Sequence, residues 1–385
     1  MQKKKKQRIV SYPRLFSFLA LFLLIIIGLS MKTYSVTRSV VSSVLNFTAS
    51  TSASMDFMKP DWSKPKLDTV AYDAKMMFLA HRTASSSASS TVSQVSASST
   101  SKTASSTKPK AFLWPAKNTA YPLPGAILPF KRIVAYYGNL YSKNMGVLGQ
   151  YEPDVMLQKL QAAAHEWELA DPSTPVQPAL HYIAVVAQGT AGNDGKYRAR
   201  MPDEQIDKVL ELAKRINAIV FLDVQVAQSN LQTELPLLEK YLKMPNVHLG
   251  IDPEFSMKTG KKPGTIIGTM DSSDINFAAQ YLAKLVRDNN LPPKILTFYR
   301  FTKKMVTNYQ NIKTLPEVQL VLAMDGWGGK AHKITAYNSF VYPDPIQFTG
   351  FKLFYKNDLK QEGGRMMTPQ EVLKLTPSPS YIQYQ

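Results

Sequence analysis

The chain has 385 residues, enough for one large domain with additional segments or for two domains. It contains no cysteine, which excludes a disulfide framework, a zinc–thiolate site, an iron–sulfur cluster and a cysteine nucleophile. The formal charge is +18, but residues 1–110 carry 16 basic and 4 acidic side chains, whereas residues 111–385 carry 30 and 24. Since most of the excess lies outside the expected fold, we expect no nucleic-acid-binding domain.

An apolar run follows a basic N-terminus. Residues 1–14 include four consecutive lysines, and residues 15–31 (LFSFLALFLLIIIGLSM) contain no charged side chain. A helix of this length is about 25 Å long, at the short end of what crosses a bilayer. Because the positive charges precede the run, we expect a basic cytoplasmic tail at 1–14, a transmembrane anchor at 15–31 and the rest of the chain outside the cytoplasm. A cleaved signal peptide is the alternative, although no A-x-A site follows the run.

The segment 32–110 is expected to be a low-complexity linker. Residues 83–107 are almost entirely Ser, Thr and Ala, and such a stretch buries too little apolar surface to offset its ordering entropy. Within this segment, residues 66–82 (KLDTVAYDAKMMFLAHR) predict a short amphipathic helix.

Residues 111–385 alternate between short apolar runs and helical patterns. Helical spacing covers residues 153–170, 231–242 and 274–290, and Pro202 opens a further helix. Runs typical of strands occupy residues 133–138, 179–188, 218–226, 247–255, 295–301, 318–327, 339–342 and 350–355. Eight strands with helical connections predict an α/β fold, a (β/α)8 TIM barrel. An open doubly wound sheet is the alternative, but no G-x-G-x-x-G follows the first strand.

Side chains alternate between the two faces of a strand. In the fourth run, Val247, Leu249 and Ile251 share one face, and Asp252 and Glu254 share the other. Because the apolar face should pack against helices, we expect the carboxylates to point into the barrel at its C-terminal rim, where TIM-barrel active sites lie. By the same alternation, the third and sixth runs bring Asp223 and Asp325 to this rim.

Clustered carboxyl groups are typical of glycoside hydrolysis. One carboxylic acid protonates the leaving oxygen, and a second group stabilises or attacks the oxocarbenium centre. Carboxylates near one another have raised pKa values, as an acid working near neutral pH requires. We therefore expect Glu254 to be the proton donor, Asp252 to orient it, and Asp223 or Asp325 to be the second carboxylate.

Sugar sites also need aromatic platforms and polar side chains. Candidates near the predicted strand ends are Tyr137, Gln188, Gln225, Arg300, Trp327, Tyr342 and Tyr355. No H-x-H or H-E-x-x-H spacing occurs, so we expect neither a histidine-held metal nor a cofactor.

Residues 130–358 resemble bacterial glycoside-hydrolase-like TIM-barrel proteins. The segment 250–255 (GIDPEF) is similar to the strand-four D-x-E ending of chitinase-type and lysozyme-type glycoside hydrolases. In the chitinase type the pattern is D-x-x-D-x-D-x-E. Asp252 and Glu254 match its last two acidic positions, whereas Val247 and Gly250 stand at the two earlier ones. The resemblance implies Glu254 as the acid and Asp252 as its helper, and its departures argue against substrate-assisted cleavage of an N-acetyl sugar.

These observations predict a membrane-anchored, extracytoplasmic hydrolase of a cell-surface or wall polysaccharide, with the lipid bilayer contacted through residues 15–31. A non-catalytic barrel that binds glycans or wall polymer is one alternative. A metal-dependent phosphoester hydrolase is the other. In it, Asp223, Asp252 and Glu254 would bind Mg²⁺ or Ca²⁺. The loop lysines that would receive an anionic substrate are Lys258, Lys261 and Lys262.

Overall fold

The structure is a computed structural model that describes residues 66–82, 112–360 and 364–385. The expected tail at 1–14, the expected anchor at 15–31 and most of the expected linker lie outside the described residues. Within the part of the chain that the structure describes, no helix combines the length and the apolar character needed to span a bilayer.

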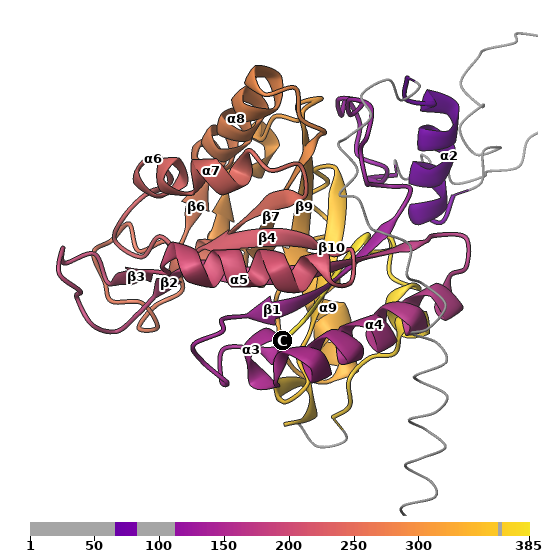
Figure 1. The fold of residues 1–385 in the computed structure, drawn as a ribbon. Coiled ribbons are helices and arrows are strands. Elements are labelled where there is room, and N and C mark those ends of the chain that lie inside the picture. Colours follow the sequence, from indigo (N-terminus) through magenta and orange to yellow (C-terminus); the bar gives the residue numbers. More distant parts are fainter. Residues whose placement is uncertain (1–65, 83–111, 361–363) are drawn as a thin grey trace, which may run out of the picture. The chain divides into compact units, whose positions relative to one another are not determined.

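Eight parallel strands close into a barrel surrounded by helices (Figure 1). The ring is complete because β1 pairs with β2 on one side and with β11 on the other, all in parallel. In order around the barrel the strands are β1 (Arg132–Gly138), β2 (Val176–Ala187), β4 (Ile219–Val224), β5 (Val247–Ile251), β7 (Lys294–Arg300), β9 (Val318–Met324), β10 (Phe348–Leu353) and β11 (Tyr381–Tyr384). The predicted TIM-like barrel is therefore confirmed, and an open sheet is excluded.

The helices follow the strands in chain order, as the barrel fold requires. The longer ones are α4 (Pro153–Ala170), α5 (Asp203–Lys214), α8 (Ser272–Asp288) and α9 (Lys330–Phe340). Short turns of helix complete the connections: α3 (Val147–Gln150), α6 (Leu231–Glu234), η2 (Leu235–Leu238), α7 (Glu239–Leu242), η3 (Pro253–Phe255), η4 (Lys303–Met305), η5 (Tyr309–Asn311), η6 (Asn357–Leu359) and α10 (Pro369–Val372). Local sequence explains where α8 begins, since the side chains of Asp271 and Asp274 each accept a hydrogen bond from the other's end of the first turn in a capping box.

Three further strands lie outside the ring. β3 (Arg198–Arg200) pairs antiparallel with β2. β6 (Met270–Asp271) pairs with β8 (Val306–Thr307) in a separate two-stranded sheet.

The prediction for the C-terminal end of the barrel needs two corrections, one for an expected strand that is absent and one for a strand that was not expected. Residues 339–342 are not a strand, because Ser339 and Phe340 end helix α9 and the chain then turns. The eighth strand is β11, which the sequence did not predict because its four residues follow a Pro/Ser-rich stretch. The expected run at 350–355 corresponds to β10, which is the seventh strand of the ring.

The strand faces follow the predicted alternation. Val247, Leu249 and Ile251 of β5 belong to the core cluster between strands and helices. Phe221 of β4 and Val321 of β9 belong instead to the cluster inside the barrel. Asp223 lies on the same face of β4 as Phe221, and Asp252 follows β5 on the face opposite Leu249 and Ile251. Both side chains are therefore directed toward the barrel interior or its mouth.

The floor of the barrel, at the N-terminal ends of its strands, is covered by a segment that precedes β1. The predicted helix within 66–82 is present as α2 (Thr69–Leu79). It is packed against the barrel rather than free: Tyr72, Met76 and Leu79 are buried in the inner cluster. The Lys75 ammonium donates to Thr174 Oγ1 over 2.6 Å, in the turn that leads into β2. This part of the expected linker therefore belongs to the folded domain.

Candidate active site

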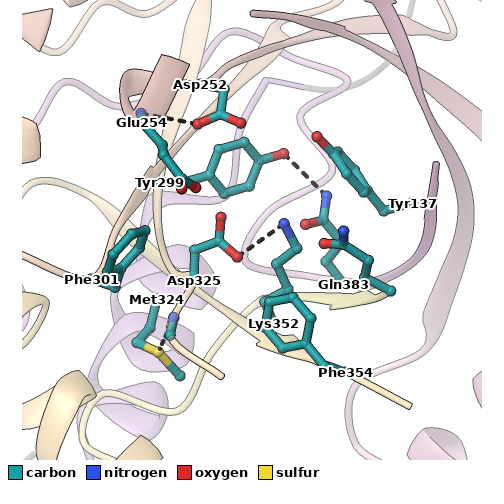
Figure 2. A network of polar contacts seen from close by, with 12 residues as sticks. Tyr137, Asp252, Glu254, Tyr299, Phe301, Met324, Asp325, Lys352, Phe354 and Gln383 are labelled. Atoms are coloured by element: carbon teal, nitrogen blue, oxygen red, sulfur yellow. Dashed lines mark hydrogen bonds and ion pairs between the residues drawn. The ribbon is translucent and has the colours of Figure 1, made fainter. Parts of the chain in front are cut away.

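A cavity of about 820 Å³ opens at the C-terminal ends of the barrel strands. Asp252, Glu254 and Asp325 line it together with Lys352 and Trp327. Figure 2 shows the three carboxyl groups turned toward one space, with Lys352 reaching in from β10. The cavity thus brings together three of the four acidic residues that the sequence placed at this rim, while the fourth, Asp223, does not line it.

Asp252 lies directly after β5 and is 2% exposed. Its Oδ1 accepts a hydrogen bond from the Glu254 backbone N–H over 3.1 Å, and its Oδ2 accepts one from Gln225 Nε2 over 3.2 Å. The first bond caps η3, so the chain leaves the strand at Pro253 and the strand alternation ends before Glu254. Glu254 reaches the cavity from this helical turn rather than from a further position on the strand.

The electrostatics of the mouth favour protonated carboxyl groups. Burial raises the pKa of Glu254 to about 7, and the neighbouring charge of Asp325 adds to the effect. Burial also raises the pKa of Asp252 well above its usual value, with the charges of Asp223 and Glu254 acting in the same direction. A carboxyl group that holds a proton near neutral pH can act as a general acid.

Asp325 is the carboxylate with a cationic partner. Its Oδ1 lies 2.9 Å from Lys352 Nζ, and both side chains are almost completely buried. Burial raises the pKa of Asp325, and the charge of Lys352 opposes that rise. The Lys352 ammonium also lies 4.3 Å from the centroid of the Tyr137 ring and 5.1 Å from that of Tyr299, where the ring faces attract a cation.

Lys352 was missed by the sequence reasoning, although a signal was present. The run 350–355 alternates in the same way as the other strands, with Phe351 and Leu353 in the outer core cluster. The opposite face therefore holds Gly350 and Lys352. Applying the alternation to every strand, instead of only to those ending in an acid, predicts a lysine inside the barrel.

Below the cavity, Asp223 is the centre of a closed hydrogen-bond network. It is fully buried, and its Oδ2 accepts from Tyr137 O–H over 3.0 Å. Its Oδ1 lies 3.1 Å from His181 Nε2, and Tyr299 O–H lies 3.0 Å from the same nitrogen. Burial lowers the pKa of His181. Gln383 ties the network to β11 by donating to Tyr299 Oη over 3.0 Å, as Figure 2 shows.

The predicted site residues therefore separate into three groups. Tyr137, Gln225 and Trp327 line the cavity with Asp252, Glu254 and Asp325, whereas Asp223 lies beneath it. The remaining candidates, Gln188, Arg300, Tyr342 and Tyr355, do not line it.

Separate structural contacts account for the side chains of Arg300 and Tyr355. The Arg300 guanidinium is paired with Asp344 and donates to the carbonyl oxygens of Lys303 and Val306, which fixes the loop after β7. Tyr355 Oη lies 2.9 Å from Tyr136 Oη on the helix side of the sheet. Tyr342 follows α9, and its carbonyl oxygen accepts from Trp114 Nε1 at the floor of the barrel.

Of the three carboxyl groups that line the cavity, Asp325 is paired with Lys352, and Asp252 accepts hydrogen bonds from Gln225 and from the Glu254 backbone. Within the described ranges, no group of three His, Cys, Asp or Glu side chains has the geometry to hold a metal ion. In the loop after β5, Lys258 is paired with Asp274, while Lys261 and Lys262 are exposed.

Comparison with known proteins adds no family to this picture. No protein-family model matches the chain, and no curated protein is similar to it in sequence.

Proposed function

We propose that this protein is a glycoside hydrolase in which Glu254 is the general acid. The observation that carries the proposal is the position of Glu254 in a cavity of about 820 Å³, with a pKa raised to about 7, close to the Asp325–Lys352 ion pair. Acid catalysis near neutral pH needs one carboxyl group that holds a proton and a second negative group that does not. Burial favours the protonated form of Glu254, which is the first group. The charge of Lys352 favours the charged form of Asp325, which is the second.

The reaction follows from these roles. The Glu254 carboxyl group gives its proton to the glycosidic oxygen as the bond from that oxygen to the anomeric carbon breaks. The Asp325 carboxylate stabilises the positive charge that develops at this carbon, and a water molecule then adds to the carbon and returns a proton to the Glu254 carboxylate. Asp252 holds the turn that carries Glu254, since its side chain accepts the Glu254 backbone N–H. Trp327, half exposed at the rim, offers an aromatic face on which a sugar ring can stack.

The proposed substrate is a cell-surface or wall polysaccharide. Support comes from the apolar run at 15–31 behind a basic N-terminus, which is typical of a membrane anchor with the barrel outside the cytoplasm. The similarity of Asp252 and Glu254 to the D-x-E ending of known glycoside hydrolases supports the same class of reaction.

The test is hydrolysis of purified wall and capsular polysaccharides by the full chain, followed by the appearance of reducing ends. Glu254→Gln should lower kcat by about 10²–10⁴-fold, because the amide cannot donate the proton. Glu204→Gln is the matched control, since Glu204 is exposed on α5 and does not line the cavity. Glycan binding without hydrolysis, unchanged in Glu254→Gln, would instead identify a non-catalytic binding barrel. Phosphoester hydrolysis that a chelator abolishes would identify the metal-dependent alternative.

A further inference from the structure

Helix α2 is apolar on two opposite faces. Tyr72, Met76 and Leu79 are buried against the barrel, as the inner face of a surface helix should be. On its outer face, however, Val70 is 78% exposed and Phe78 is 49% exposed. An isolated surface helix normally carries polar residues there, so this face indicates a second apolar environment.

The exposed apolar surface continues onto the segment that follows in the described chain. Phe112 is 57% exposed and Tyr121 is 46% exposed, and Leu113 and Leu123 are exposed as well. Tyr121 O–H donates to Asp73 Oδ2 over 2.8 Å, and the Arg82 guanidinium lies 4.2 Å from the Phe112 ring centroid. These contacts join both segments into one surface, which we call the floor surface: the exposed side chains of residues 66–82 and 112–131.

Basic side chains are interspersed among the apolar ones. Residues 66–82 and 112–131 contain five basic residues against two acidic ones, Asp68 and Asp73. The basic residues are Lys66, Lys117 and Lys131, which are exposed, and Lys75 and Arg82, which are partly buried. The Lys75 ammonium lies 4.6 Å from the Phe78 ring centroid, in the same arrangement as Arg82 over Phe112. Exposed aromatic rings beside lysine and arginine are typical of surfaces that insert rings at the lipid interface and place cations among anionic headgroups.

We propose that the floor surface docks on a lipid bilayer with anionic headgroups. Chain composition favours this occupant over the segment that joins the two parts of the surface. Residues 83–111, which lie between the two parts of the surface, are mostly Ser, Thr and Ala and offer few large apolar groups. The expected membrane anchor, at 15–31, is the longest uncharged apolar run and is joined to Lys66 by residues 32–65 alone. An anchor there would hold α2 near the bilayer. The consequence is orientation: the floor is at the N-terminal ends of the strands, so the docked barrel directs its mouth away from the bilayer.

The absence of cysteine allows a direct test, because one introduced cysteine is the only site that a thiol label can reach. Val70→Cys and Phe112→Cys place a fluorophore on the floor surface of the full chain. Tyr141→Cys is the matched control, an exposed apolar residue (65% exposed) in the loop after β1 at the mouth. Each labelled protein is added to vesicles of phosphatidylglycerol, or of phosphatidylcholine alone, containing a lipid with a headgroup nitroxide that quenches the fluorophore.

Docking predicts that phosphatidylglycerol vesicles quench both floor labels several-fold more strongly than the Tyr141→Cys label. The difference should shrink in phosphatidylcholine, in high salt, and in the double variant Lys66→Gln/Lys117→Gln, because each removes charge attraction to the headgroups. Equal quenching of floor and mouth labels would overturn the proposal. So would floor labels that are already shielded from water before vesicles are added, since that result means that the chain itself or a second copy covers the surface.

Discussion

The Lys352 ammonium lies 2.9 Å from Asp325 Oδ1 inside the barrel mouth, with both side chains almost fully excluded from water. Asp252 and Glu254 share the cavity, but neither has an ion-pair partner within the described residues. A buried carboxyl group without a cation avoids the cost of desolvating a charge by keeping its proton. The ion pair therefore makes the carboxyl groups of the mouth differ in how readily each keeps its proton. Acid catalysis by one of them requires this difference.

Removing the charge of Lys352 should raise the pKa of Glu254 above about 7, because the Lys352 charge now lowers it. In Lys352→Met, the basic limb of the pH profile of kcat/KM is expected to move to higher pH. Titration of a ¹³C-labelled Glu254 carboxyl group by NMR measures the same shift without any substrate. Lys352→Arg, which keeps the charge, should leave the titration close to that of the unmodified chain. A Glu254 titration that is identical in all three proteins would show that Lys352 does not act on the acid.

The raised pKa of Glu254 should also make the fold less stable as the pH rises. The folded state binds this proton up to a pH of about 7, whereas the unfolded chain releases it near its ordinary value of 4.5. The destabilising contribution is therefore absent below pH 4.5, grows between 4.5 and 7, and is complete above 7. Because Glu254 is partly exposed, we expect this contribution to lower the free energy of unfolding by about 1–3 kcal/mol.

Glu254→Gln isolates this contribution, since the amide does not titrate. Urea unfolding at pH 8.5 should show that the variant is more stable than the unmodified chain, and at pH 4 the two should agree. Equal stability at both pH values would mean that the folded protein does not hold the proton on Glu254.

Gly250 is required by the network below the cavity. A Cβ at this position would lie 2.5 Å from His181 Nε2 and would also collide with Asp223 Oδ1, and both partners are fully buried. Gly250→Ala should therefore lower the free energy of unfolding by about 1–3 kcal/mol, the usual cost of overpacking a core. Gly189→Ala is the control, because nothing lies within 4 Å of a Cβ at that position. Denaturant melts of the two variants give the comparison, and equal midpoints would contradict the close packing around Gly250.

Gly250 also shows what the residue pattern along one strand can and cannot predict. Its position corresponds to an acidic residue in the chitinase-type pattern, and the sequence alone presents this as a departure from the family. In the structure, Asp223 from the neighbouring strand β4 occupies the interior next to Gly250, so no larger side chain fits there. Contacts between strands that are far apart in the chain are not contained in the spacing of residues along one strand.

The alternation of side chains was the informative signal in the sequence. It placed Asp223, Asp252 and Asp325 on the interior side of three strands, because apolar partners such as Leu222 and Leu322 mark the opposite face. This alternation did not predict where a strand ends, and it did not predict a very short strand. The turn at Pro253 and the four-residue strand β11 depend on backbone hydrogen bonds and on closure of the ring, which no local pattern encodes.

Trp327 provides a test of substrate binding that is separate from the acid. Its side chain is half exposed, it lines the cavity, and the Lys360 ammonium lies 5.8 Å from its ring centroid. Losing an aromatic face at the rim removes stacking on a sugar ring worth about 1 kcal/mol, so Trp327→Ala should weaken oligosaccharide binding about fivefold. The melting temperature should change little, since a rim side chain adds little to the core. Leu169→Ala is the control, because Leu169 is exposed on α4 outside the cavity. Calorimetric titration of both variants measures the effect, and equal affinities would place the sugar away from Trp327.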